Sequence, residues 1–399
     1  MNFCICYNII EPINININMN TMDKLENIII SIINKNDICQ IKNAINVLSP
    51  LINEHSESIH PNHPHHQQYI ILEHIQHNVC KVMNSGSGCD GCVCSGDCRG
   101  RGCRDGGCGG RGGCDKISIM KKYSKGSPKI KRILMEREVY EKVKHPLICT
   151  CEKMFDDCNY YYLILDYYEK SLHDILKQNF INGNENIIRF YTAELLCALE
   201  YLHINGYIHK DIKPENIMID KNGHIKLTDF DLSCKTNVSV NMNNNAIEYK
   251  ENTFYDDNVN YITNICGTIE YIPPEIIVGN RYNSKVDLWM FGILLYELKY
   301  KKTPFLDISQ MDKYNNKDNV GLIIDELYDN ITKNKITFDD THPISAELQP
   351  ISADLRDLIM KLLVKNPNSR LNITEIKNHA FYKDINFNLI MSYNPPLYN

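Results

Sequence analysis

The residues HKDIKPEN (209–216) and, thirteen positions after Asn216, the residues DFD (229–231) decide how this 399-residue chain is expected to fold. A stripe of apolar residues with helical spacing precedes them and ends at Asn205 and Gly206, a pair that is typical of a helix C-terminus. Between the two motifs, a KNG turn is followed by the alternating residues HIKLTDF, which predict a short strand. Both polar motifs are therefore expected on loops that a helix and short strands hold in place.

These motifs together resemble those of the protein kinases, whose catalytic loop reads HRDxxxxN and whose metal-binding motif reads DFG. The resemblance implies that Asp211 accepts the proton of the acceptor hydroxyl and that Lys213 neutralises the transferring phosphate. It also implies that Asn216 and Asp229 hold Mg²⁺ through oxygen ligands, which this cation prefers. Lys213 within DIKPEN indicates the serine/threonine class rather than the tyrosine class.

Two positions depart from the kinase pattern. Lys210 replaces the arginine of HRD, and it keeps the charge but loses the planar fork that grips an activation-loop phosphate. Asp231 replaces the glycine of DFG, and Asp tolerates unusual backbone angles better than most residues. The run TDFDLS resembles the phototropin-like branch of the AGC kinases, whose active members carry DFD. We therefore expect Asp231 to be compatible with activity.

The resemblance extends to a glycine-rich segment, GSGCDGCV (86–93), which matches the GxGxxGxV loop that covers the phosphates of ATP in kinases. Gly86, Gly88 and Gly91 are expected to let the backbone approach the phosphates, and Val93 is expected to lie over the adenine. The alternative is a chance match inside a disordered insert, because twelve of the chain's twenty glycines lie between Gly86 and Gly113.

The run ISIMKKYSK resembles the kinase strand that carries the ATP-binding lysine. Lys121 is the first candidate for that lysine, Lys122 is its rival, and Lys116 is a third candidate. The ion-pair partner is expected to be Glu136 in KRILMEREVYEKVKHP, a run that resembles the family's αC helix, with Glu138 as the alternative.

The run YYLILDYYEKSLHDIL resembles the fifth strand, the hinge and the following helix of a kinase. Leu165 is expected to be the gatekeeper, and backbone groups of Asp166 and Tyr168 are expected to bind the edge of the adenine. Many AGC kinases carry an acidic residue for ribose and substrate arginine where this chain has Ser171. The sequence alone therefore does not predict a preference for basic substrates.

Further downstream, CGTIEYIPPE resembles the end of a kinase activation segment. The resemblance implies that Glu275 pairs with Arg370 in the interior and that Asp287 anchors the catalytic loop from below. Where the AGC group often carries a phosphorylated Ser or Thr, this chain has Asn264, with Thr263 one place away. We therefore expect activity without phosphorylation of this segment.

Composition narrows the class of protein. A net charge of −6 and a pI near 6.2 argue against nucleic-acid binding, which usually requires a basic surface. No run reaches the roughly 18 apolar residues that a membrane span requires. The first ten residues lack the basic start of a secretory signal, so the expected location is the cytoplasm, with the nucleus as the alternative.

We expect residues 1–77 to form a low-complexity, His-rich extension with two short helices, and residues 78–395 to form the kinase domain. Two inserts are expected within the domain. Residues 94–115 are rich in Cys and Gly and form either a flexible loop or a structural metal site. Residues 235–262 are a polar insert in the activation loop, and such polar stretches rarely pack.

The fold class implied by the resemblance is α+β, with a small β-rich lobe, a larger helical lobe and ATP between them. The implied function is a serine/threonine protein kinase that uses ATP and Mg²⁺, acts on protein substrates and is a monomer. One alternative is a pseudokinase that binds nucleotide without catalysis. Another is a metal-binding interaction protein that uses the Cys- and His-rich first third.

Overall fold

The computed structural model describes residues 69–76, 78–84, 116–236, 238–243, 246–251, 269–306, 320–338 and 350–396. The chain divides into two units, residues 1–67 and 68–399, and all described residues belong to the second unit. The short helices predicted before residue 53, the glycine-rich segment 86–93 and the Cys-rich insert 94–115 lie outside the described residues. None of the helices in the described ranges has the length and apolar character that crossing a membrane requires.

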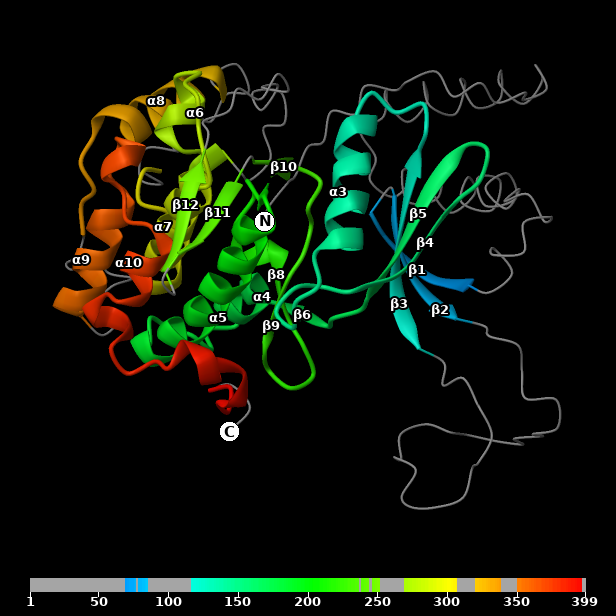
Figure 1. Cartoon of the computed structure of the whole chain (residues 1–399), viewed down its shortest axis with the longest axis horizontal. Coiled ribbons are helices and arrows are strands. Elements are labelled where there is room, and N and C mark those ends of the chain that lie inside the picture. Colours follow the sequence, from blue (N-terminus) through cyan, green and yellow to red (C-terminus); the bar gives the residue numbers. More distant parts are fainter. Residues whose placement is uncertain are drawn as a thin grey trace, which may run out of the picture. The chain divides into compact units, whose positions relative to one another are not determined.

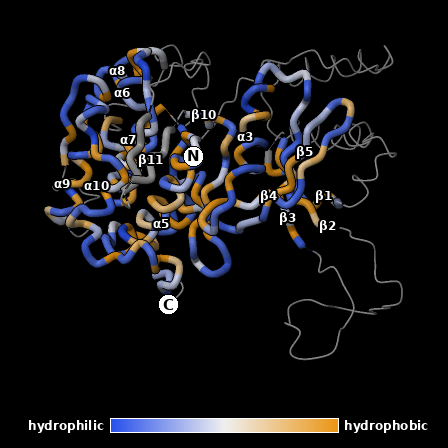
Figure 2. The backbone as a smooth tube through the Cα atoms, in the orientation of Figure 1, coloured by the Kyte–Doolittle hydropathy of each residue, from blue (hydrophilic) through white to orange (hydrophobic). Residues whose placement is uncertain are grey.

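The small lobe is built on a five-stranded antiparallel sheet in the order β1-β2-β3-β5-β4 (Figure 1). Its strands are β1 (Tyr69–Gln76), β2 (Val79–Asn84), β3 (Ile117–Ser124), β4 (Cys151–Asp156) and β5 (Tyr160–Asp166). Hydrophobic residues gather along β3, β4 and β5 (Figure 2). Four consecutive residues of β5, Tyr162 to Leu165, are buried and alternate between two hydrophobic clusters, so both faces of β5 are covered. This burial explains why β-branched and aromatic residues recur in these strands.

The start of this sheet corrects the predicted domain boundary. The predicted boundary falls between residues 77 and 78, whereas β1 begins at Tyr69 and the compact unit begins at Gln68. His74, which falls in the predicted His-rich extension, lies in β1 with its Nδ1 3.2 Å from Cys80 Sγ on β2. A histidine-rich stretch precedes β1, and it masked a strand whose residues YIIL favour β-structure.

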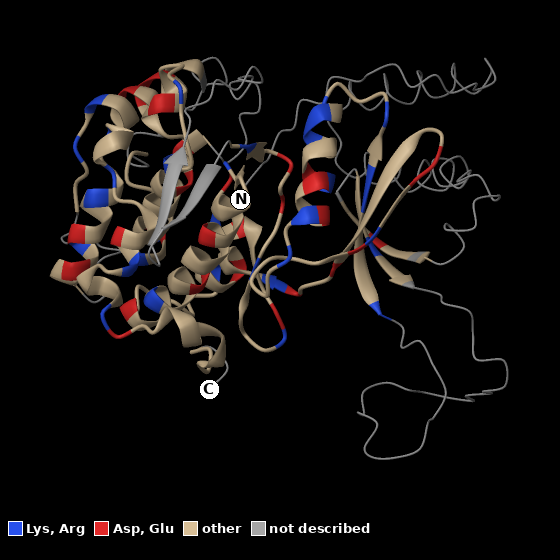
Figure 3. Cartoon of the chain, viewed as in Figure 1, with Lys and Arg blue, Asp and Glu red and all other residues tan. Residues whose placement is uncertain are grey.

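One long helix accompanies the sheet, α3 (Ile130–Lys142). It lies beside the sheet in Figure 1 and carries charged residues of both signs along its length in Figure 3. Its buried residues are Ile133, Glu136, Val139 and Tyr140, which recur at helical spacing. One of these four, Glu136, is a carboxylate, so this helix brings a charge into the interior.

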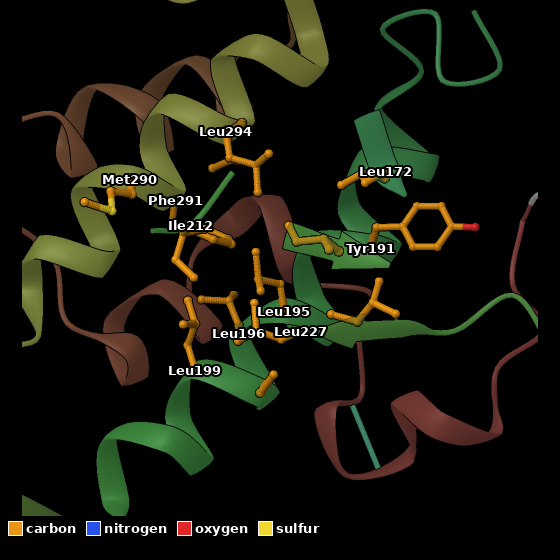
Figure 4. Packing of buried hydrophobic residues seen from close by; sticks show 14 of the residues in the cluster. Leu172, Tyr191, Leu195, Leu196, Leu199, Ile212, Leu227, Met290, Phe291 and Leu294 are labelled. Carbon is orange, nitrogen blue, oxygen red and sulfur yellow. The ribbon is translucent and has the colours of Figure 1, made fainter. Parts of the chain in front are cut away.

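The large lobe is mainly helical, and its central pair of helices is α5 (Glu185–Ile204) and α7 (Lys285–Tyr300). The other helices are α4 (Leu172–Lys177), α6 (Pro274–Ile277), α8 (Val320–Lys333), α9 (Ala353–Leu362) and α10 (Ile373–Lys377). Apolar residues of α5 and α7 pack in one cluster with Ile212, which lies within the first motif, and Leu227, which lies just before the second (Figure 4). The loops that carry these motifs are therefore attached directly to the core.

Short strands frame the two motifs. They are β6 (Lys170–Ser171), β7 (Tyr207–Ile208), β8 (Ile217–Ile219), β9 (Ile225–Leu227) and β10 (Cys234–Lys235). The predicted helix end is confirmed, because Asn205 caps α5 and Gly206 follows with a φ of 80°, a value that favours glycine. The predicted KNG turn is also confirmed: it joins β8 to β9 with Gly223 at a φ of 89°.

The segment 235–262 differs in part from the prediction of an unpacked insert. Residues Val238–Asn243 (β11) and Ala246–Glu251 (β12) pair as an antiparallel hairpin. Backbone pairing of this kind does not require large apolar side chains, which is why the polar composition of the segment misled the prediction.

The large lobe is braced by the buried pair of Glu275 and Arg370. Arg370 donates from both terminal nitrogens to the two carboxylate oxygens, at 2.8 and 3.0 Å. Such a bidentate pair is strong and directional, and it joins α6 to the segment that precedes α10. The sheet-rich small lobe and the helical large lobe together confirm the predicted two-lobed α+β fold.

Candidate active site

Lys121 on β3 lies between two carboxylates from different parts of the fold. Its Nζ is 2.7 Å from Glu136 Oε1 on α3 and 2.7 Å from Asp229 Oδ1 after β9. Glu136 is fully buried and Lys121 is only 9% exposed. Burial favours the neutral amine, but the charges of Asp229 and Glu136 outweigh it and hold the pKa of Lys121 well above its ordinary value.

The rival lysines have other partners. Lys122 points to the opposite face of β3, where its Nζ lies 4.1 Å from the centre of the Tyr160 ring. Lys116 reaches the end of β5, with its Nζ 2.8 Å from Asp166 Oδ1. Of the three candidates, Lys121 is therefore the one that the structure brings to a glutamate on α3.

Glu138, the alternative partner for the lysine, faces the large lobe instead. It accepts hydrogen bonds from Lys142 on its own helix, from Tyr207 on β7 and from Lys235 on β10. The hydrogen bonds from Lys142 and Lys235 lower the pKa of Glu138 to about 2. It therefore links α3 to the start of the activation segment.

The catalytic loop brings Asp211, Lys213 and Asn216 together. Lys213 Nζ and Asn216 Nδ2 each lie 2.7 Å from Asp211 Oδ2, and Asn216 Nδ2 is also 2.8 Å from the Asp211 carbonyl oxygen. The other carboxylate oxygen of Asp211, Oδ1, has no hydrogen-bond partner among the described residues, although it is buried. One oxygen is therefore held in place while the other remains available to accept a proton.

Asp287, at the start of α7, holds the catalytic loop from within the core. Its Oδ2 accepts from the backbone N–H of His209 at 2.9 Å and contacts His203 Nε2 at 2.7 Å. Its Oδ1 accepts from the N–H of Lys210 at 2.8 Å, and Lys210 has a φ of 65°, which is uncommon for a residue other than glycine. Although burial raises it, the pKa of Asp287 is held below its usual range by the hydrogen bond from His203.

The metal motif is fixed by aromatic packing. The Phe230 ring is fully buried, 5.1 Å from the ring of Tyr140 on α3 and 5.0 Å from that of His209. Asp229 has a φ of 67°, and its carboxylate is partly exposed. Although burial opposes it, the charge of Lys121 holds the pKa of Asp229 below its usual range.

Two oxygen-bearing side chains suit a hard cation at this place. Thr228 donates its N–H to the Asn216 carbonyl oxygen at 3.0 Å. This backbone hydrogen bond brings Asn216 close to Asp229, the next residue after Thr228, whose carboxylate is partly exposed. Within the described ranges, no three or more His, Cys, Asp or Glu side chains form a metal site. Asn216 and Asp229 together would suit Mg²⁺, since this cation takes one or two protein ligands and completes its shell with phosphate and water.

Asp231, the departure from DFG, is half-buried in the turn that follows Phe230. Burial raises the pKa of Asp231 to about 7, and the charge of Asp229 adds to the rise. The turn forms with aspartate in place of glycine, and Ser233 closes it by donating its N–H to the Phe230 carbonyl oxygen.

The hinge lies at the end of β5. Leu165 is buried there, and Asp166 donates its N–H to the Thr150 carbonyl oxygen at 3.0 Å. The Tyr168 hydroxyl reaches Asp166 Oδ2 at 3.4 Å. Ser171 caps α4 in a capping box with Asp174, so its hydroxyl is engaged in holding the helix start.

The glycine-rich segment is not part of the described site. Gly86, Gly88, Gly91 and Val93 lie outside the described residues. Strand β3 pairs with β5 on one side and with β2 (Val79–Asn84) on the other, and Val79 lies opposite Lys121. Strand β2 precedes the glycine-rich segment in the chain. The segment therefore lies between β2 and β3 in the chain, and its contact with phosphates stays a prediction.

Sequence reasoning missed two tyrosines of the site. Tyr123 donates its hydroxyl to Glu136, and the Tyr140 hydroxyl lies 3.2 Å from Thr228 Oγ1. The only available signal was their spacing, since Tyr123 shares a strand face with Lys121 and Tyr140 follows Glu136 by one helical turn.

Comparison with known proteins agrees with this geometry. Residues 114–382 match the family model of the protein kinase domain. The chain is 35% identical over 283 residues to Flippase kinase 1 of Saccharomyces cerevisiae and 36% identical over 282 residues to Phototropin-1A of Oryza sativa subsp. japonica. It is 34% identical over 300 residues to Serine/threonine-protein kinase WAG1 of Arabidopsis thaliana. Each match covers 67% of this chain, but 29%, 28% and 59% of the respective relative.

The anchor at Asp287 leads to a prediction about stability. Asp287→Asn should lower the free energy of unfolding by about 3 kcal/mol, because it removes a buried charge that three donors share. Urea denaturation measures this change. Asp357→Asn is the matched control, since Asp357 also contacts a lysine and a histidine but its side chain is 45% exposed, and its loss should stay below about 1 kcal/mol. Equal losses in the two variants would show that Asp287 is not an anchor.

Proposed function

The chain belongs to the protein kinase family, and we propose that it transfers the γ-phosphoryl group of Mg·ATP to serine and threonine hydroxyls of protein substrates. The observation that carries the proposal is the joint arrangement of Lys121 with Glu136 and Asp229. This arrangement places the buried ammonium group of Lys121 beside the carboxylate of Asp229, which would bind the metal ion. The resemblance of DIKPEN to the serine/threonine class supports the choice of acceptor.

Mg·ATP supplies the phosphoryl group, and its cation neutralises charge on the phosphate oxygens. Asp229 and Asn216 would hold the cation, and Lys121 would bind phosphate oxygens while Glu136 keeps it in place. Asp211 orients the acceptor hydroxyl through Oδ1 and takes its proton, because Oδ2 is already held by Lys213 and Asn216. Backbone groups of Asp166 and Tyr168 would hold the adenine.

A pseudokinase is the less favoured alternative. All the side chains that the chemistry needs on the large lobe are present, and one carboxylate oxygen of Asp211 has no hydrogen-bond partner in the described part of the chain.

The division of roles between Asp211 and Asp229 gives the test of the proposed function. Asp211→Asn should lower kcat by about 1,000-fold, since general base and orientation effects have this size, while the Kd for Mg·ATP stays within twofold of wild type. Asp229→Ala should instead abolish the gain in ATP affinity that Mg²⁺ provides. Turnover of [γ-³²P]ATP with a generic protein substrate and calorimetric titration measure both effects. Retained turnover in Asp211→Asn would refute the assignment of the loop.

Three glutamates beside the catalytic loop bear on the choice of substrate. Glu215 lies within the loop itself, Glu270 lies in the turn Ile269–Tyr271, and Glu297 lies on α7. The Tyr271 hydroxyl donates to Glu297 and the Thr303 hydroxyl donates to Glu270. Burial raises the pKa of Glu297 to about 7, and the charges of Glu215 and Glu270 contribute. We infer that a basic residue near the acceptor hydroxyl relieves this repulsion.

This inference predicts a pH-dependent preference. Glu297 is neutral below its pKa of about 7 and ionised above it, so the attraction for a basic residue grows as pH rises through 7. The ratio of kcat/KM for a serine peptide with neighbouring arginines to that for its alanine analogue should rise about 3- to 10-fold from pH 6 to pH 8. Glu297→Gln should abolish the rise. A ratio that is flat in the wild type would contradict the inference.

The surroundings of Lys210 support activity without phosphorylation. Lys210 is 2% exposed, its Nζ donates to the Tyr282 hydroxyl at 3.2 Å, and it lies 5.5 Å from the centre of the Tyr282 ring. A buried ammonium on an aromatic ring is poorly placed to bind a phosphate. The contact of Glu138 with Lys235 already joins α3 to the activation segment by charge. Thr263 and Asn264 lie outside the described residues.

We therefore expect bacterially expressed protein to keep more than about half of its kcat/KM after complete phosphatase treatment, because no phosphate is needed to order a site that side chains already hold. Thr263→Ala should behave as wild type in the same assay. A loss of most activity in both experiments would mean that Thr263 phosphorylation controls the enzyme.

A further inference from the structure

The carboxylate of Glu136 is held by two donors from the same strand. Oε1 accepts from Lys121 Nζ at 2.7 Å, and Oε2 accepts from the Tyr123 hydroxyl at 2.7 Å. Lys121 and Tyr123 are two positions apart on β3, so their side chains leave the strand on the same face. Among the described residues, no other group donates a hydrogen bond to Glu136.

The two donors are not equivalent. Lys121 is shared with Asp229, and in the proposed function it also binds phosphate, so its hold on Glu136 varies with the state of the site. The Tyr123 hydroxyl donates its hydrogen bond to Glu136. A fully buried carboxylate oxygen that loses its donor is costly, because neither water nor another side chain replaces the bond. Tyr123 therefore provides the constant part of the attachment of α3 to the sheet.

The phenol is the right kind of donor at this place. Burial and the neighbouring charge of Glu136 raise the pKa of Tyr123, so the hydroxyl keeps its proton and donates it. The ring itself is half-buried and packs against the main hydrophobic core. A phenylalanine at this position would keep the packing and lose only the hydrogen bond.

We propose that Tyr123 is a positioning residue of this kinase, which holds Glu136 and thereby α3 in the arrangement that presents Lys121 to the phosphates. The inference rests on the proposed function. In the absence of the hydroxyl, Glu136 and α3 are free to leave the site, and a smaller share of molecules has Lys121 correctly placed. Tyr123 acts through Glu136 and touches neither nucleotide nor substrate.

The test compares Tyr123→Phe with Tyr162→Phe. Tyr162 lies on β5 of the same sheet, is 1% exposed and donates its hydroxyl to a carboxylate, Asp157 Oδ2, at 2.9 Å, away from the site. Both variants lose one hydroxyl–carboxylate bond and keep the ring. Tyr123→Phe should lower kcat/KM for ATP by about 10- to 100-fold, the usual size for a hydrogen bond to a charged group. Tyr162→Phe should stay within threefold, and melting temperatures confirm that both variants are folded.

A double-mutant cycle separates positioning from packing. In a Glu136→Ala background, Tyr123→Phe should change kcat/KM by less than twofold, since the group through which it acts is gone. Full loss in that background, or equal losses in the Tyr123 and Tyr162 variants, would overturn the proposal.

Calorimetric affinity for ATP is a second readout that does not depend on turnover. It should weaken in Tyr123→Phe and stay unchanged in Tyr162→Phe. If the wild type binds ATP but shows no transfer, the proposed function fails, and this affinity difference still decides the role of Tyr123. Equal ATP affinity in wild type and Tyr123→Phe would refute that role.

Discussion

The ammonium group of Lys121 is the interaction on which the site depends. It has lost nearly all of its water, and such a charge is tolerated in a protein interior only when partners of opposite charge surround it. Those partners come from two places: Glu136 on the helix of the small lobe, and Asp229 on the loop after β9 of the large lobe. The two ion pairs that compensate the buried charge of Lys121 thus fix α3, β3 and the metal motif relative to one another.

The large lobe must hold its own half of this arrangement rigidly. Lys210 and Asp229 both adopt left-handed backbone angles, each of which costs on the order of 1 kcal/mol for a residue other than glycine. Asp287 offsets the cost at Lys210 by accepting the hydrogen bond of the Lys210 N–H. The buried ring of Phe230 holds the neighbouring Asp229 in its backbone conformation. The strain is stored where the chemistry takes place, as is common at functional sites.

The large-lobe motifs were predictable because chemistry dictates both their residue types and their spacing. Asp211, Lys213 and Asn216 lie on one loop, where Lys213 and Asn216 both contact the Asp211 carboxylate, and the helix that precedes them is followed by Gly206, where glycine takes the backbone angle easily. The choice between Lys121 and Lys122 was harder, since it depends on which face of β3 meets α3. Strand β1 was missed because the histidine-rich stretch around it obscured its β-forming residues. The Tyr123 contact could not be predicted, because a tyrosine on a strand is usually a packing residue.

The central claim is that the buried lysine between the two carboxylates, and not its neighbour, places the phosphates. Phosphoryl transfer by Lys121→Met and Lys122→Met measures this most directly, because the two variants remove the same charge from adjacent positions on opposite faces of β3. The account predicts that Lys121→Met loses about 100-fold or more in kcat/KM, the size expected for removing a preorganised charge at the reacting group. Lys122→Met, whose lysine lies over Tyr160, should stay within about threefold of wild type, as surface substitutions usually do. A large loss in Lys122→Met together with an active Lys121→Met would contradict the account.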